Sequence, residues 1–140
     1  MRLVLDTNVV VAGMRSPGGA SAELIRRARR GRATLVSTVA LALEYEAVCR
    51  REEHRRAAAL SAAETELFLD AIVALAEPVE TWFLWRPQLR DPSDELVLEA
   101  GVNGRADAIV TFNRRDFAPG ASRFGVEVLL PREALMRTPE

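Results

Sequence analysis

The sequence of 140 residues contains no lysine, one histidine and one cysteine. The single Cys49 cannot form an internal disulfide, and it cannot supply the thiolates of a cysteine-rich metal site. We expect it to be a small buried residue within a helix. One histidine is also too few for a histidine-rich site. A metal held by this chain would therefore bind to oxygen ligands.

Long hydrophobic runs are also absent. The apolar runs are far shorter than the ~20 residues that a membrane span needs, and Met1-Arg2 leads directly into a predicted strand without a signal-peptide pattern. We therefore expect a soluble, cytoplasmic protein without membrane contact. The length, with 49% apolar residues, predicts a single domain over residues 1–140.

Every basic residue except His54 is an arginine, and the net charge is only −1. The chain thus lacks the overall basic excess that is typical of many nucleic-acid-binding proteins. Its arginines cluster at 26–32, 50–56 and 114–115. Because the planar guanidinium group suits phosphate, these clusters are candidates for contact with a nucleic-acid backbone. They can equally be solvated helix faces.

Short apolar runs alternate with helical patterns along the chain. Strands are expected at 2–5, 33–36, 79–84, 106–111 and 125–130, and helices begin near residues 9, 20, 39, 62, 92 and 131. Strands that alternate with helices imply parallel pairing with right-handed crossovers and helices on both faces. The predicted fold class is α/β, in three layers around a short central parallel sheet.

Two apolar features bear on partners. The helix that opens with a capping box at Ser61 carries a stripe that we predict to be buried, made of Leu67, Phe68, Ala71, Ile72 and Leu75. The cluster from Trp82 to Trp85 follows it. A domain of this size has little reason to expose two tryptophans unless a partner covers them. Together with the narrow apolar stripe of the arginine-rich second helix, this cluster predicts a homodimer.

Acidic residues lie at two places where a charge needs an explanation. Asp6 directly follows the first apolar run, so it either caps the next helix or faces a ligand at the carboxyl edge of the sheet. Glu44 has alanine, leucine and valine as its helical neighbours, so it lies on an apolar face. It either needs a metal or a distant cation as its partner, or reaches water at the edge of that face.

More acids follow at matching places downstream. Asp91, Asp94 and Glu95 lie at a helix start, where the helix dipole alone favours acids, while Asn113 and Asp116 follow the strand that ends at Thr111. The carboxyl ends of parallel strands share one edge, where clustered carboxylates cannot stay ionised together unless a cation neutralises them. Oxygen ligands select magnesium or manganese, which implies hydrolysis or transfer at phosphorus.

Four segments, at residues 3–8, 43–48, 90–95 and 106–117, resemble in their order and spacing the PIN-domain proteins, in particular the toxin components of toxin-antitoxin modules. The resemblance covers nearly the whole chain. It implies a PIN-like fold, a ribonuclease that depends on Mg²⁺ or Mn²⁺, an RNA substrate and a small antitoxin protein as partner.

The resemblance also implies roles for particular residues. The acids that would hold the metal and carry catalysis are Asp6, Glu44, Asp94 and Asp116. The supporting polar residues would be Thr7, Asp91, Thr111 and Asn113, and the RNA backbone would contact Arg114 and Arg115. Asp91 and Asp94 remain alternatives as direct ligands, as do Asn113 and Asp116.

Two other classes of function remain open. A phosphatase of the haloacid dehalogenase type also begins with an apolar strand and an aspartate, but it needs a second acid two residues later, where Asn8 stands. A catalytically silent module that binds RNA or a protein partner is the second alternative. The acids present at all four places argue against a silent module.

Overall fold

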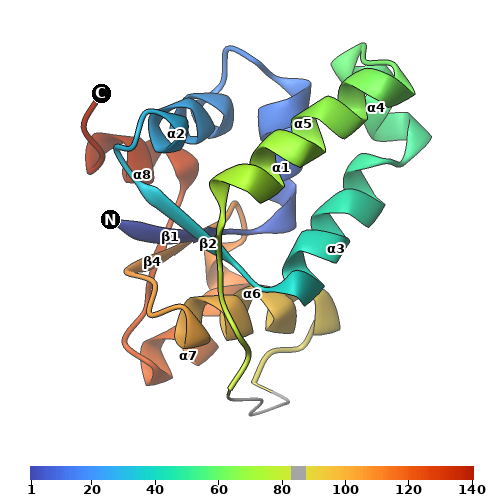
Figure 1. Cartoon of the computed structure of the whole chain (residues 1–140). Coiled ribbons are helices and arrows are strands. Elements are labelled where there is room, and N and C mark those ends of the chain that lie inside the picture. Colours follow the sequence, from blue (N-terminus) through green and yellow to red (C-terminus); the bar gives the residue numbers. More distant parts are fainter. Residues whose placement is uncertain (83–87) are drawn as a thin grey trace.

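A five-stranded parallel sheet in the order β3-β2-β1-β4-β5 forms the centre of the protein (Figure 1). The computed structural model describes residues 1–82 and 88–140. The strands are β1 (Arg2–Leu5), β2 (Thr34–Ser37), β3 (Glu77–Pro78), β4 (Ala108–Val110) and β5 (Glu127–Leu129). The helices of the described part are α1 (Thr7–Arg15), α2 (Ala20–Arg29), α3 (Val39–Cys49), α4 (Glu52–Ala58), α5 (Ala62–Leu75), α6 (Pro92–Asn103), α7 (Arg114–Arg123) and α8 (Pro131–Met136).

Helices cover both faces of the sheet, which confirms the predicted three-layer α/β/α fold (Figure 1). From β1 the chain moves outward to β2 and β3, then returns to the other side of β1 for β4 and β5. Right-handed crossovers in opposite directions place their helices on opposite faces. Accordingly, α6 packs on β1, β2 and β4 with α7 beside it, while α1, α2 and α8 pack together in the other layer.

The apolar core joins the central strands to both helical layers. Leu3 and Val4 of β1 are completely buried, as are Ile109 of β4 and Phe117 of α7. Cys49 is also completely buried, which confirms its expected place. Within the described residues, every helix is too short or too polar to cross a membrane.

Three predicted elements differ from the structure. The third strand was expected at 79–84 but is the two-residue β3, and positions 83–84 lie outside the described residues. The charged segment after Arg51 forms the short helix α4, and Asp116 lies in the first turn of α7 rather than in an irregular turn. Neither α4 nor α7 has a long apolar stripe, so the hydrophobic periodicity of the sequence did not predict these two helices.

The predicted buried stripe of α5 is wrong in part. The capping box at Ser61 is present, and Ile72 is buried, but Leu67 is 70% exposed. Ala71 is exposed as well, and Phe68 is only half-buried. The rest of the described chain therefore covers only part of the apolar face of α5.

The close packing at the end of α6 leads to a prediction about stability. A Cβ atom on Gly104 would lie 2.7 Å from the Ala100 carbonyl oxygen and 3.0 Å from a methyl of Val36. We expect Gly104→Ala to lower the free energy of unfolding by about 1–3 kcal/mol, because the added methyl overpacks this junction. Gly18→Ala is the matched control, since a Cβ there meets nothing within 4 Å. Equal stability of both variants in urea titrations would contradict the prediction.

Candidate active site

The candidate site lies at the carboxyl ends of β1 and β4, where the strand order reverses. Leu5 of β1 pairs with Val110 of β4, so the residues that follow each strand, Asp6 and Thr111, are neighbours. The Asp6 N–H also donates a hydrogen bond to the Val110 carbonyl, at 2.9 Å. Open α/β sheets bind ligands outside the strand ends at such a switch point.

The Asp6 carboxylate is held by a side chain of the neighbouring strand. It is only 5% exposed, and its Oδ2 accepts a hydrogen bond of 2.7 Å from the Thr111 hydroxyl. Burial raises its pKa, and the Thr111 hydrogen bond and the N–H groups of Thr7 and Asn8 oppose that shift. Asp6 is the N-cap residue of α1 without a side-chain capping hydrogen bond, although the Thr7 and Asn8 N–H groups lie close enough to its carboxylate to lower its pKa. Its position agrees with both interpretations of the sequence, a helix cap and a residue that faces a ligand.

Thr111 links two parts of the site. Its hydroxyl donates to Asp6 and accepts a hydrogen bond of 2.9 Å from the Asn113 N–H. Thr111 itself is completely buried. With the hydroxyl proton directed at Asp6 and a lone pair at Asn113, the orientation of this group is determined by both neighbours. The Asn113 side chain is exposed and does not cap α7.

Asp91 and Asp94 differ in their surroundings although both lie at the start of α6. Asp91 caps the helix, because its Oδ1 accepts a hydrogen bond of 2.9 Å from the Ser93 N–H. Asp94 is half-buried, and burial, followed by the negative charges of Asp6, Asp91 and Asp116, raises its pKa to about 6. The structure thus brings Asp6 and Asp116 close enough to Asp94 for their charges to raise its pKa.

A cavity of about 470 Å³ opens beside Asp94 and Asp116, and Asp6 is not among the residues that line it. Its lining includes Asp91, Asp94 and Asp116 together with two arginines, Arg90 and Arg115. The cavity therefore combines carboxylates, which attract a cation, with guanidinium groups, which attract an anion. This mixture is chemically suited to a phosphate group accompanied by a metal ion.

Glu44 is not among the residues that line this cavity. It is half-buried on α3, a helix that packs against both α1 and α6. The neighbouring Tyr45 is buried, and its hydroxyl donates a hydrogen bond to the Leu5 carbonyl. Glu44 therefore lies on a helix anchored beside Asp6, but the structure does not bring its carboxylate into the acidic cavity.

The acidic side chains of the site differ from a complete metal site. Over residues 1–82 and 88–140, no three Asp, Glu, His or Cys side chains are placed as a ready-made metal site. Magnesium typically binds one or two carboxylates and keeps several waters, whereas calcium and structural zinc take larger sets of protein ligands. Asp6, Asp94 and Asp116 offer oxygen ligands only, the type that Mg²⁺ and Mn²⁺ prefer, but the three are not together within reach of one ion, so an ion bound here would keep waters in its remaining positions.

Two residues at this site were missed by the sequence analysis. Glu95 is buried, and its Oε1 accepts hydrogen bonds from the Gln88 and Leu89 N–H groups, so it holds the segment before Asp91. It was passed over because acids are common in the first turn of a helix. Arg90 directly precedes Asp91, and it was not predicted as a phosphate contact because no other arginine lies beside it in the sequence.

The two arginines that were predicted to contact RNA have different surroundings. The Arg114 guanidinium forms an ion pair of 3.0 Å with Glu133 at the start of α8. Arg115 instead lines the acidic cavity. Among the predicted RNA contacts, Arg115 is therefore the one that faces the candidate site.

Comparison with known proteins agrees with this geometry. A family model described as PIN domain matches residues 2–115, which include β1, β4, Asp6 and Asp94 and end one residue before Asp116. No curated protein matches the chain in a sequence search. PIN domains are generally nucleases that use divalent metal ions and act on nucleic acids. With most of its length matched by this model, the chain belongs to the PIN-domain family.

Proposed function

We propose that this protein is a ribonuclease that hydrolyses RNA phosphodiester bonds with the help of Mg²⁺ or Mn²⁺. The observation that carries the proposal is the grouping of Asp91, Asp94 and Asp116 with Arg90 and Arg115 around one cavity. Burial, and after it repulsion by the charges of Asp6, Asp91 and Asp116, raises the Asp94 pKa to about 6. Such mutual repulsion destabilises the ionised cluster unless a cation neutralises it. A structural ion-pair network would instead place cations of the protein directly on these carboxylates.

Asp6, Asp94 and Asp116 would hold the metal, and Glu44 would approach it from α3. A bound divalent cation would activate water for attack and stabilise negative charge at the phosphodiester. Thr111 keeps the Asp6 carboxylate in one orientation through its hydrogen bond. Because Asp91 caps α6, we assign direct metal contact to Asp94 and a positioning role to Asp91.

The substrate backbone would be bound by the arginines of the cavity. Arg90 and Arg115 line the same cavity as Asp94 and Asp116, so each can contact a phosphate next to the one that reacts. Arg114 would support the start of α7 through its pair with Glu133. Cleavage with departure of the 3′ oxygen gives a product with a 5′ phosphate.

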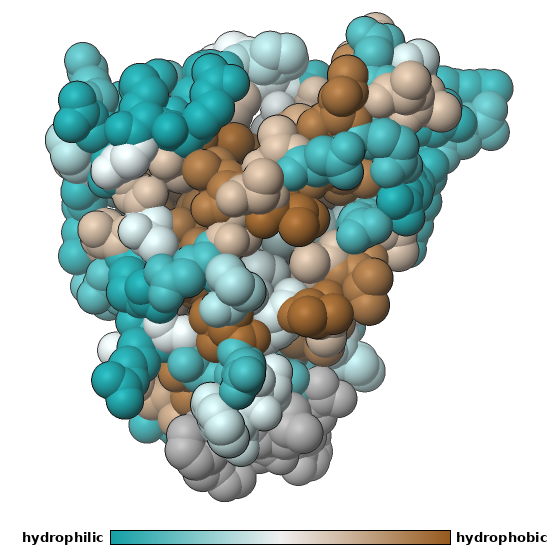
Figure 2. Space-filling model, viewed as in Figure 1, coloured by the Kyte–Doolittle hydropathy of each residue, from teal (hydrophilic) through white to brown (hydrophobic). Residues whose placement is uncertain are grey.

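The family resemblance further supports a role as the toxin of a toxin-antitoxin pair, with a small antitoxin as partner. We also propose that the chain forms a homodimer. Trp82 is 74% exposed, and Val39 and Leu43 of α3 are 75% and 58% exposed. In Figure 2, brown hydrophobic surface extends over the region of α5 and α3. The predicted contribution of residues 83–85 to this surface lies outside the described residues.

The first prediction from this proposal concerns Asp6. Asp6→Asn should keep the fold, since the amide oxygen can still accept the Thr111 hydrogen bond, but should remove metal-dependent cleavage of RNA. We expect a loss larger than the ~10–100-fold typical of changes around a metal ligand. Cleavage of a labelled single-stranded RNA, with 5′-phosphate analysis of the products, measures it. Asp70→Asn, at an exposed acid of α5, is the control. Full activity of pure Asp6→Asn protein would refute the assigned role.

The second prediction concerns pH. Since the Asp94 pKa is raised from 3.8 to about 6, the unfolded chain releases this proton at lower pH than the folded protein does. The Asp94 contribution to stability without metal therefore falls as pH rises from about 4 to about 6. Metal binding requires the ionised carboxylate, so Mg²⁺ should raise the melting temperature more at about pH 7 than at about pH 5. The same increment at both pH values would contradict this role of Asp94.

The third prediction concerns self-association. Light scattering of the native protein should give the mass of two chains of 15.4 kDa. Leu43→Glu places a charge on the exposed face of α3 and should give the mass of one chain, since an unpaired charge at an interface is costly to desolvate. Met136→Glu is the control, because Met136 is also exposed but lies on α8. A native protein with the mass of one chain would exclude the dimer.

A further inference from the structure

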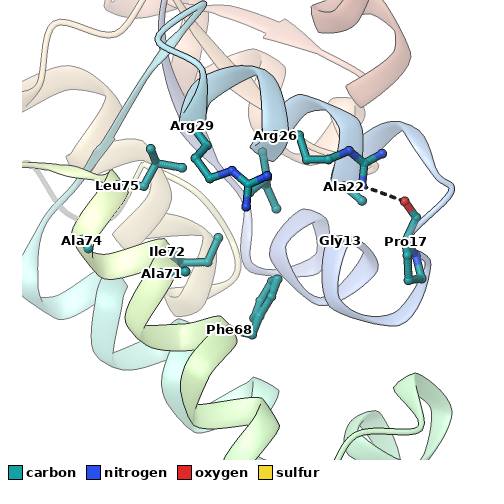
Figure 3. A pocket seen from close by; sticks show the side chains of 11 residues that line it. Gly13, Pro17, Ala22, Arg26, Arg29, Phe68, Ala71, Ile72, Ala74 and Leu75 are labelled. Atoms are coloured by element: carbon teal, nitrogen blue, oxygen red, sulfur yellow. Dashed lines mark hydrogen bonds between the residues drawn. The ribbon is translucent and has the colours of Figure 1, made fainter.

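Two cavities that the proposed function does not use differ in their relation to the acids. The larger has a volume of about 550 Å³ and lies between α2 and α5. Phe68 and Leu75 of α5 line it, and the Arg29 guanidinium reaches toward it from α2 (Figure 3). Of its lining residues, Gly13 comes nearest in sequence to an acid of the site, seven positions after Asp6. This apolar cavity shares no lining residue with the acidic cavity.

The second cavity begins one residue beyond Thr111, at the end of β4. It has a volume of about 470 Å³ and lies where the end of α1, the start of α2 and the start of α8 meet. The residue after Thr111, Phe112, lines it together with Ser21, Leu130 and Arg132. A cavity of this volume is large enough to hold a small ligand. We call this space the Phe112 cavity.

Phe112 connects this cavity to the acids. It directly follows Thr111, whose hydroxyl donates a hydrogen bond of 2.7 Å to Asp6. Four positions after Phe112, Asp116 lines the acidic cavity. Four residues span at most about 14 Å even when fully extended, and stacked nucleotides of one strand are about 3.4 Å apart. An RNA strand with its phosphate at the acids therefore has a nearby nucleotide within reach of Phe112.

The Phe112 ring is suited to a nucleobase. The side chain is 49% exposed, and single exposed apolar residues are common on protein surfaces. This one, however, lines a cavity and adjoins the proposed reaction site. Every nucleobase has a flat π face that stacks on aromatic rings with little regard to sequence. Single-stranded RNA is often bound in this way, with unstacked bases placed on aromatic side chains. A base next to the reacting phosphate is thus the group that Phe112 is placed to bind.

Two polar groups of the Phe112 cavity are free to bind the rest of a nucleotide. Arg132 is exposed, and within residues 1–82 and 88–140 no acid pairs with it. Ser21 is 4% exposed, and its hydroxyl makes no hydrogen bond in the described part of the chain. A buried hydroxyl without a partner costs free energy, so a ligand that bonds with it is favoured. The guanidinium suits a phosphate, and the hydroxyl suits a ribose or phosphate oxygen.

We propose that the Phe112 cavity binds one nucleotide of the RNA strand beside the reacting phosphodiester, with its base stacked on Phe112 and its phosphate paired with Arg132. Charge complementarity and continuity with the acids favour this occupant over a protein side chain. The inference rests on the proposed function in taking RNA as the ligand. Its test measures binding with the metal removed, whereas the proposed function is tested by cleavage, so either can fail without the other.

The experiment measures the affinity for a labelled uridine octamer by fluorescence anisotropy in EDTA, with melting temperatures to show that each variant is folded. Phe112→Ala should weaken binding about tenfold, or about 1.4 kcal/mol, which is within the range for one base–aromatic stack. Phe112→Tyr keeps a ring and should bind like the native protein. Phe112→Leu fills similar space without a π face and should bind like Phe112→Ala. An octamer of ribose and phosphate without bases should bind native protein and Phe112→Ala equally.

Salt dependence tests the role of Arg132. Arg132→Gln should reduce the magnitude of the slope of log affinity against log salt by about 0.7, the value of one phosphate contact on a single strand. The reduction should be the same with and without bases, because the contact is to a phosphate. Arg29→Gln and Met136→Ala are the controls, since they change exposed residues that do not line the Phe112 cavity. Both should bind RNA like the native protein.

Native affinity of Phe112→Ala for the uridine octamer would overturn the proposal, as would equal affinities of Phe112→Leu and Phe112→Tyr. A Phe112→Ala defect of the same size on the octamer without bases would also overturn it, because the ring would then act on the fold and not on a base. A dimer that Phe112→Ala reduces to one chain, with unchanged affinity for RNA, would place a second copy in the cavity instead.

Discussion

The hydrogen bond from the Thr111 hydroxyl to the Asp6 carboxylate is the contact on which the candidate active site depends. A carboxylate that is 5% exposed costs free energy unless its charge is compensated. The Thr111 hydroxyl compensates this charge together with the N–H groups of Thr7 and Asn8, and it connects the ends of two strands that are far apart in sequence. The parallel register of β1 and β4 brings the two residues together. The sheet topology, rather than any local motif, thus creates the polar centre.

This dependence explains which parts of the site could be predicted from sequence. Asp6 follows one short apolar run, and Asn113 and Asp116 follow the run that ends at Thr111, so the common edge of parallel strands predicted that these segments lie together. The hydrogen bond of Thr111 with Asp6 was not predicted from the pattern. The different roles of Asp91 and Asp94 could not be predicted from the sequence. The two residues are only three positions apart, and only the structure shows that Asp91 caps α6 while Asp94 lies near other acids.

The helices show the same limit. The sequence of α7 includes Pro119 and Gly120, residues that weaken a helix in isolation. Phe117 is completely buried, so tertiary packing stabilises this helix despite its composition. At α5 the periodicity identified the apolar face correctly, but periodicity reports only that a face is apolar. It contains no information about whether the same chain or another molecule covers it.

The arginines illustrate how one residue type serves separate purposes in a chain with little net charge. Arg50 lies between Glu46 and Glu66 and forms ion pairs with both, and such exposed pairs contribute little to stability. Arg115 lies beside acids that repel one another, and Arg29 lies beside an apolar groove without an acid of its own. Total charge therefore says little about binding here. What matters is where each guanidinium lies and whether an acid already pairs with it, as the acids beside Arg50 and the cavities beside Arg29 and Arg115 show.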